Sequence, residues 1–253
     1  MSQHNYNIYP SLLDKFSSYL NSSQIYQEYY GFAENPSISE DEFEQQKLQE
    51  LFNGINRVPF ESEAADKGTM FNELIDCIIE NRKSETMVLN SNLFPDTIQV
   101  SWKNWIHQFN KDDCKTIAQA LKGAFCQVYQ EGFIETKYGY VKLYGYLDHL
   151  LPFRVVDLKT TGKYSAFKFR NNWQHIVYPF LLNFNGNFIT DFTYLVYQWT
   201  KNGGEIYEEE YTYDERKDLP KLVDFVERFI EFLKENREKI TDLKIFNLQK
   251  ELV

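Results

Sequence analysis

Residues 145–159 of this 253-residue chain read GYLDHLLPFRVVDLK, so two aspartates, Asp148 and Asp157, and a lysine, Lys159, stand close together. They lie on two segments that read as β-strands. Side chains alternate between the faces of a strand, so Asp157 and Lys159 share one face and Leu158 points into the core. A turn between the segments would fold Asp148 back to within metal-bridging distance of Asp157. Two carboxylates beside an ammonium group suit metal-assisted phosphodiester hydrolysis, in which oxygen ligands hold Mg²⁺, the ion activates a water and the lysine orients it.

An amphipathic helix is predicted after these strands, over residues 173–181. It carries Gln174 and Tyr178, which are four residues apart and therefore share one face of the helix. The central part of the chain thus has the order helix, three strands, helix, strand. Hydrophobic periodicity predicts helices over 11–20, 43–52, 70–79 and 219–240, strands over 124–136, 140–149, 153–159, 192–200 and 206–213, a hairpin turn at 202–204, and a helical, irregular segment over 88–122.

The spacing of these motifs resembles that of the PD-(D/E)XK nuclease superfamily and, within it, of the RecB-type and phage exonuclease branch. Asp148 matches the first acidic ligand, and residues 157–159 match the Asp/Glu-x-Lys signature. Gln174 and Tyr178 match the Gln-x-x-x-Tyr motif that follows in this branch. Together these pieces form a composite that is far more specific than an isolated Asp-x-Lys.

The resemblance implies an α/β fold with a restriction-endonuclease-like core, in which helices flank a mixed central sheet, with helices added at both ends. We expect a single nuclease domain over residues 1–253. Its parts are a helical N-terminal addition (1–60), the catalytic core (61–200), and a hairpin strand with a C-terminal helix (201–253).

The resemblance also implies roles for individual residues. Asp148, Asp157 and the backbone carbonyl of Leu158 would hold Mg²⁺ or Mn²⁺. Lys159 would act on the attacking water, while Gln174 and Tyr178 would position the lysine and the DNA. A bound metal would offset the charge of the two carboxylates.

The helix that precedes the strands departs from the family pattern. In the RecB-type branch this helix carries a histidine ligand four residues after a glycine, and here the residue four after Gly68 is Asn72. An amide oxygen can ligate a metal but adds no charge, so metal affinity or metal choice would differ. Asn72 borders the apolar stripe of the helix and is the first choice for this ligand; Asp76, one turn later, is the second. Glu73 is expected to face solvent, and an exposed asparagine near a helix start is the alternative for Asn72.

The amino-acid composition limits which binding partners and which cellular compartment are expected. The net charge of −10 argues against a nucleic-acid binder, but residues 122–173 contain eight basic and four acidic side chains, a basic segment that is compatible with DNA binding. No signal peptide or membrane span is evident, and Cys77, Cys114 and Cys126 lack zinc-like spacing. We therefore expect reduced intracellular thiols, and the resemblance implies the cytoplasm of a bacterial or phage-infected cell. Three cysteines cannot supply the four-cysteine iron–sulfur cluster of some RecB-type nucleases.

The functional expectation is a Mg²⁺- or Mn²⁺-dependent deoxyribonuclease. By resemblance, it is an exonuclease that acts on linear DNA ends in phage or bacterial recombination and repair, with a recombinase or single-strand-binding protein as a candidate partner. A structure- or sequence-specific endonuclease is one alternative, and a non-catalytic nucleic-acid-binding module with a degenerate site is another. A third treats the charged residues as a salt-bridge cluster in an interaction protein. Oligomeric state, polarity, strand preference, the choice between DNA and RNA, and the number of metals stay open.

Overall fold

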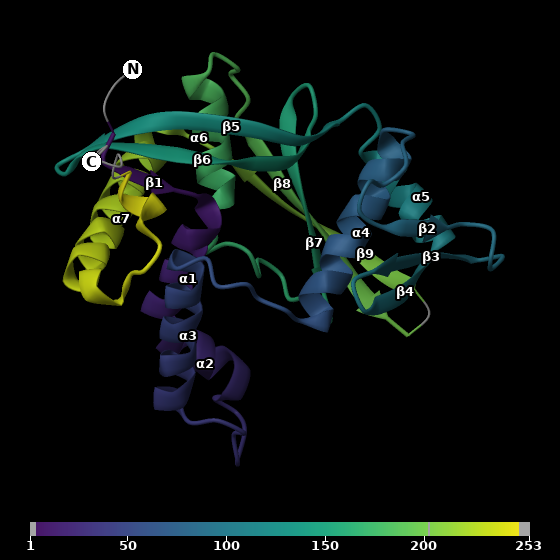
Figure 1. Ribbon diagram of the computed structural model, residues 1–253, viewed down its shortest axis with the longest axis horizontal. Helices are drawn as coiled ribbons and strands as arrows, with labels where there is room; N and C mark the ends of the chain where they lie inside the picture. Colours follow the sequence, from purple (N-terminus) through teal and green to yellow (C-terminus); the bar gives the residue numbers. More distant parts are fainter. Residues whose placement is uncertain (1–3, 202, 248–253) are drawn as a thin grey trace, which may run out of the picture.

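The computed structural model of the protein describes residues 4–201 and 203–247. Within these residues the chain forms an α/β fold, in which helices flank a six-stranded mixed sheet (Figure 1). The strand order is β1-β6-β7-β8-β9, and β5 pairs with the other edge of β6. The strands of this sheet are β1 (Tyr6–Ile8), β5 (Phe125–Thr136), β6 (Gly139–Leu150), β7 (Arg154–Thr161), β8 (Asp191–Thr200) and β9 (Gly203–Thr212).

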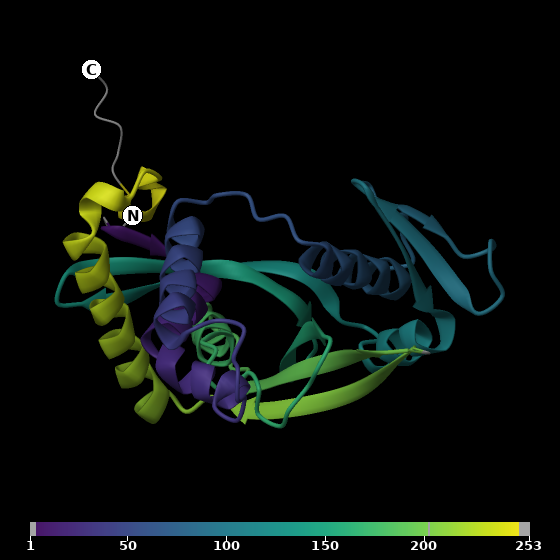
Figure 2. The same ribbon diagram turned by 90° about the horizontal axis from the view of Figure 1, so that it is seen from below.

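The helices lie in two groups along this sheet, with α4 crossing one end and α7 at the other (Figure 2). A small antiparallel sheet beside α4 consists of β2 (Val88–Asn90), β3 (Thr97–Trp102) and β4 (Trp105–Asn110). None of the described helices is both long and apolar enough to cross a bilayer. The α-helices are α1 (Pro10–Leu20), α2 (Ser22–Tyr30), α3 (Glu40–Ile55), α4 (Glu63–Ile79), α5 (Lys111–Ala120), α6 (Gln174–Phe184) and α7 (Glu215–Glu235), followed by short 3₁₀ turns at Arg237–Lys239 and Leu243–Phe246.

Local sequence explains where several helices begin. Pro10 occupies the first position of α1, where a missing N–H has no consequence. Ser39 and Glu42 form a capping box at the start of α3, each bonding a backbone N–H of the other residue. The Asn110 side chain accepts two backbone N–H groups at the start of α5.

Strand β7 separates two hydrophobic cores. Val155 packs with α1, α6 and α7 in one core, whereas Val156 and Leu158 pack with α4, α5 and the small sheet in the other. Parallel pairing of β7 with β8, through the crossover helix α6, buries both faces of β7. Its three apolar residues, Val155, Val156 and Leu158, are accordingly all buried. Asp157 therefore lies on a strand that has no solvent-facing side.

One edge of β6 contains a gap in the pairing. Residues 6–8 of β1 pair with residues 141–143 of β6, and residues 155–156 of β7 pair with residues 149–150. Between them, residues 144–148 have no strand partner on that edge within the described part of the chain, while β5 pairs along the opposite edge. The motif that begins at Gly145 thus lines an opening in the sheet.

Most predicted elements are confirmed, but several differ from the structure. The segment 88–122 is not mainly helical: it forms β2–β4 and α5, since residues 97–102 alternate between buried and more accessible positions as a strand does. α4 begins at Glu63, so Gly68 lies inside it rather than before it. β7 extends through Thr161 rather than breaking at residue 160, and α7 spans Glu215–Glu235 rather than 219–240. Gly203 belongs to β9, and position 202 of the predicted turn lies outside the described residues.

Candidate active site

Asp148 and Asp157 lie on neighbouring antiparallel strands, β6 and β7. The last paired residues are His149 with Val156, so the next position in this register sets Asp148 opposite Asp157. The strands diverge at this point, and the Leu158 backbone N–H donates a 3.3 Å hydrogen bond to Asp148 Oδ2. The turn between β6 and β7 therefore brings the two carboxylates together, which the spacing predicts.

Lys159 lies between one of these carboxylates and helix α6. Its Nζ atom is 2.7 Å from Asp157 Oδ1 and donates a 2.8 Å hydrogen bond to Gln174 Oε1. Asp157 is 1% exposed, and its Oδ1 receives no well-aligned hydrogen bond among the described residues despite the nearby ammonium group. Gln174, at the first turn of α6, thus holds the lysine beside the buried carboxylate of Asp157.

The charges at this edge perturb one another. Burial and the neighbouring Asp157 carboxylate raise the pKa of Asp148 to about 7, although Lys159 opposes the change. Burial alone would lower the pKa of Lys159, but Asp157 and Asp148 outweigh it and the pKa is raised. The lysine is therefore held as an ammonium, and the two aspartates repel each other when both are ionised. A cation bound between them would relieve that repulsion.

Helix α4 supplies one more polar group to the same edge. Asn72 Nδ2 lies 3.4 Å from the carbonyl oxygen of Leu158, and Asn72 Oδ1 is buried without a hydrogen-bond partner among the described residues. Asp148 and Asn72 thus contact the backbone of the same residue from two different elements. The absence of a side chain at Gly68 lets α4 approach β7 closely, because a Cβ added there would lie 2.8 Å from Thr160 Oγ1.

Asp76 and Glu73, the two acidic residues of α4 that were considered beside Asn72, are engaged elsewhere. Asp76 pairs with His149, whose Nε2 lies 2.8 Å from Asp76 Oδ1. Glu73 does not simply face solvent, because it forms a half-buried ion pair with Arg82 at 2.7 Å. Of the three polar residues considered on this helix, only Asn72 contacts the backbone of Leu158.

The Tyr178 ring packs over Gly145, the first residue of the 145–159 stretch. A Cβ at Gly145 would lie 3.0 Å from the Tyr178 ring, so the ring reaches this position only because residue 145 has no side chain. Tyr178 and Gln174 line a pocket of about 290 Å³ at the gap in the β6 edge. Its other lining residues are Tyr9, Pro10, Ser11, Arg57, Tyr144, Gly145 and Tyr146. A larger hollow between α2 and α3 contains none of the candidate site residues.

The structure adds a third carboxylate that sequence reasoning missed. Asp14 of α1 accepts a hydrogen bond from the Trp173 backbone N–H, just before Gln174. Burial raises its pKa to about 7, and Lys159 and Asp157 are close enough to influence it. No sequence signal identifies it, because Asp14 lies about 160° around the helix from the centre of the α1 apolar stripe.

The predicted basic segment is less basic in three dimensions than its composition indicates. Four of its eight cations are paired with acidic side chains, three of them with partners outside the metal-ligand candidates. These pairs are Lys137 with Glu227 and Glu231, Lys142 with Glu131, Lys159 with Asp157, and Arg170 with Glu28. Arg57 lines the pocket itself, where it hydrogen-bonds Tyr144 and pairs with Asp242. The charge of Arg57 is thus also offset by an acidic partner.

Taken together, this edge of the sheet offers oxygen ligands to a hard cation and an ammonium group to an anion. Comparisons with known proteins add little. A scan against protein families finds no match, and a search of curated proteins finds none. A solved structure described as "Crystal structure of SSO0001" is 12% identical; the alignment covers 92% of this chain and 79% of that chain, with a TM-score of 0.47. Similarity this weak carries no argument about function, which has to be inferred from the site.

Proposed function

We propose that the protein is a Mg²⁺- or Mn²⁺-dependent deoxyribonuclease of the PD-(D/E)XK superfamily. The observation that carries the proposal is the position of Lys159. Its ammonium group lies within 3 Å of both Asp157 and Gln174, on the edge where Asp148 approaches the same strand. The single charge of this lysine cannot neutralise both carboxylates. Such an arrangement is expected at a site that receives a metal ion and a phosphate.

The order of elements supports the same proposal. Helix α4, strands β5–β7, helix α6 and strand β8 follow one another as the family core requires, with β2–β4 and α5 inserted after α4. The signature strand β7 pairs in parallel with β8 through the crossover helix that carries Gln174 and Tyr178. The composite sequence motif and this connectivity are independent of each other, which strengthens the inference from either one.

The residues present fit a hard divalent cation. Asp148, Asp157, the Leu158 carbonyl and Asn72 would hold it, since all supply oxygen atoms. Asn72 Oδ1 is a buried acceptor without a hydrogen-bond partner in the described structure, which is unfavourable unless a ligand satisfies it. A half-turn of the Asn72 amide would direct its oxygen toward the Leu158 carbonyl, an arrangement that only a shared cation would favour. When bound, such an ion polarises the phosphate and lowers the pKa of a water.

The protein groups around that position have separate tasks. Lys159 places a positive charge where negative charge develops on the phosphate oxygens, and Gln174 fixes the direction of the ammonium group. Tyr178 and Arg57 line the adjacent pocket, where the guanidinium group can bind a backbone phosphate of the substrate strand. Since that pocket opens at the gap in the β6 edge, the strand would approach between β1 and β7.

Digestion of end-labelled linear and covalently closed circular DNA, with Mn²⁺, Mg²⁺ or EDTA, tests this function. We expect metal-dependent loss of the linear substrate only, which corresponds to an exonuclease acting at DNA ends in recombination or repair. Lys159→Ala should abolish it. Lys163→Ala, which removes an exposed lysine four residues later, is the matched control and should retain activity. Circular dichroism of both variants establishes that they are folded.

Two other outcomes would change the proposal. Nicking of the circular substrate would identify an endonuclease. Binding of DNA without cleavage under any metal, by wild type and Lys159→Ala alike, would favour a non-catalytic module. The observation on which that second candidate rests is Asn72, which supplies a neutral ligand where the RecB-type branch has a histidine.

A further inference from the structure

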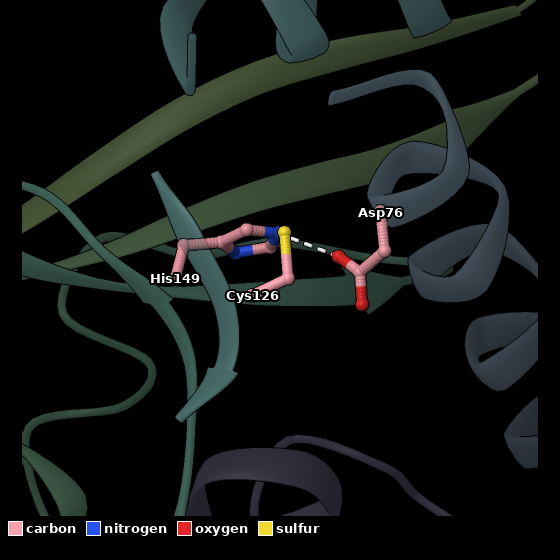
Figure 3. A group of neighbouring side chains, drawn as sticks. All are labelled: Asp76, Cys126 and His149. Carbon is pink, nitrogen blue, oxygen red and sulfur yellow. Dashed lines mark hydrogen bonds and ion pairs between the residues drawn. The ribbon is translucent and has the colours of Figure 1, made fainter. Parts of the chain in front are cut away.

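A second group of potential ligands lies behind the candidate nuclease site. Asp76 of α4, Cys126 of β5 and His149 of β6 each offer one ligand atom, and these atoms all lie within 4.8 Å of one another. Figure 3 shows the three side chains pointing toward one another, with the ion pair between His149 and Asp76 drawn. The three residues are separated by 50 and 23 positions in the chain, so only folding brings them together.

The backbone holds two of the three in place. Cys126 and His149 are direct cross-strand partners on β5 and β6, so their Cβ atoms are expected about 5 Å apart on the same face. Helix α4 lies over this pair and contributes Asp76, which is 2% exposed. Gln127, next to Cys126, has a left-handed backbone with φ of 51° and donates a 3.2 Å hydrogen bond to Asp76 Oδ2. Such strain in a non-glycine residue requires support from its surroundings and concentrates at functional positions.

The hydrogen bonding of the cluster is incomplete. His149 is fully buried, and its Nδ1 atom has no partner among the described residues. Burial raises the pKa of the Cys126 thiol, and the nearby Asp76 and Glu80 raise it further. The other ligand atoms face one another: His149 Nε2 and the Gln127 amide contact the Asp76 carboxylate, and the thiol lies beside it.

We propose that Asp76, Cys126 and His149 form a Zn²⁺ site distinct from the oxygen site at Asp148 and Asp157. Sulfur, nitrogen and oxygen donors together are typical of zinc, whereas Mg²⁺ prefers oxygen alone. Tetrahedral zinc keeps its ligand atoms roughly 3.3–3.8 Å apart, so the 2.8 Å pair of His149 and Asp76 has to open only slightly. Zinc binding needs a thiolate and a neutral imidazole with Nε2 free, so the thiol proton passes to solvent and the proton between His149 and Asp76 leaves Nε2, either for Nδ1 or for solvent. Cys126, the least buried ligand, marks the side where a water completes the coordination.

This site would fix two candidate nuclease residues. Asp76 stands one helical turn after Asn72 on α4, and His149 directly follows Asp148 on β6. A metal bridging them ties α4 to β5 and β6, and so sets the distance between Asn72 and the Leu158 backbone. The zinc site itself does not depend on nuclease activity, and its test does not require any.

Cobalt provides the test, because Co²⁺ bound by a thiolate gives a near-ultraviolet charge-transfer band and intense visible bands in tetrahedral geometry. We expect the metal-stripped full-length protein to give both signals as Co²⁺ is added, with the charge-transfer band saturating at one Co²⁺ per chain in this cluster whatever the oxygen site binds, and Zn²⁺ to remove both signals. Cys126→Ser should lose the charge-transfer band and bind Zn²⁺ at least about tenfold more weakly. Cys77→Ser is the matched control: it removes a thiol of α4 that is not part of the cluster, and it should retain the band.

A second variant separates the two sites. Asp157→Asn should keep the cobalt spectrum unchanged, because Asp157 is not part of the cluster. The proposal is overturned if wild type shows no thiolate band, if folded Cys126→Ser keeps it, or if Asp157→Asn removes it. Loss of nuclease activity in any variant plays no part in this decision, so the zinc site and the nuclease can fail separately.

Discussion

The oxygen site at Asp148 and Asp157 and the cluster of Asp76, Cys126 and His149 adjoin each other, yet they are built differently. The first depends on two strands that are consecutive in the chain, with its lysine two residues from an aspartate. The second combines a helix with two strands and includes no two neighbouring residues. A site assembled from consecutive elements leaves a readable spacing in the sequence, whereas one assembled from distant elements does not. Donor chemistry differs as well, since only the second contains sulfur and nitrogen.

The largest expected effect is that one substitution in each region abolishes the response to one metal and leaves the response to the other metal intact. Asp157→Asn should reduce metal-dependent DNA cleavage about 10³-fold or more and abolish the increase in melting temperature caused by Mn²⁺, because it removes a charged ligand. Cys126→Ser should keep the Mn²⁺-dependent increase but lose that caused by Zn²⁺. Differential scanning fluorimetry with each metal measures both effects. If each variant loses both responses, the two regions form one site and the comparison fails.

His175 is a half-buried histidine that belongs to neither set of candidate ligands. Burial lowers its pKa to about 4, from an ordinary value near 6.5. The unfolded chain then binds a proton that the folded protein excludes, so stability should fall as pH drops from about 6.5 to about 4. The loss is on the order of 3 kcal/mol. His175→Gln should flatten this fall in urea titrations at several pH values, while the cobalt spectrum stays unchanged. An unchanged pH profile in the variant would exclude His175 as the cause.

Asp14 tests whether burying a carboxyl group next to Lys159 and Asp157 costs stability. Its pKa is raised from 3.8 to about 7, so the folded protein keeps a proton that the unfolded chain loses first. The protonated Asp14 carboxyl group therefore contributes fully to the stability of the folded protein below about pH 4, and this contribution is lost as the pH rises through about 7. Asp14→Asn preserves an acceptor for the Trp173 N–H and should stabilise the metal-free protein by about 2 kcal/mol at pH 8. Chemical denaturation at pH 8 and pH 4 measures this; equal effects at both pH values would contradict it.

The smallest expected effect concerns α4, the helix that the two regions share. Alanine at a helix-interior glycine normally stabilises by about 1 kcal/mol. At Gly68 the added Cβ would meet Thr160 Oγ1 at 2.8 Å, so we expect Gly68→Ala to bring little or no gain. Removing the obstacle in Gly68→Ala/Thr160→Ala should recover it relative to Thr160→Ala alone. Thermal denaturation of the four proteins completes the cycle, and a full gain in the single variant would show that α4 does not need this close approach.

Local pattern predicted the elements around the oxygen site well. The strands expected over 124–136, 140–149 and 153–159 correspond to β5, β6 and β7 to within about two residues, because alternation and β-branched residues are strong there. β1 was not predicted, since three residues are too few to show a period. The segment 88–122 was misjudged because its short strands are amphipathic and interrupted by polar turns. Its strands pack on α4, a contact that no local pattern encodes.

The sequence by itself determined that Asp157 and Lys159 share a strand face and that Asp148 precedes a turn, because these are matters of spacing within a few residues. It also determined the helix face that carries Gln174 and Tyr178. Only the tertiary structure decided that Gln174 holds Lys159, that Asn72 rather than Asp76 contacts Leu158, and that Asp14 joins the charges. It alone brought Cys126 to His149 and Asp76. The physical reason is that these contacts depend on how helices pack on a twisted sheet, which involves residues far apart in the chain.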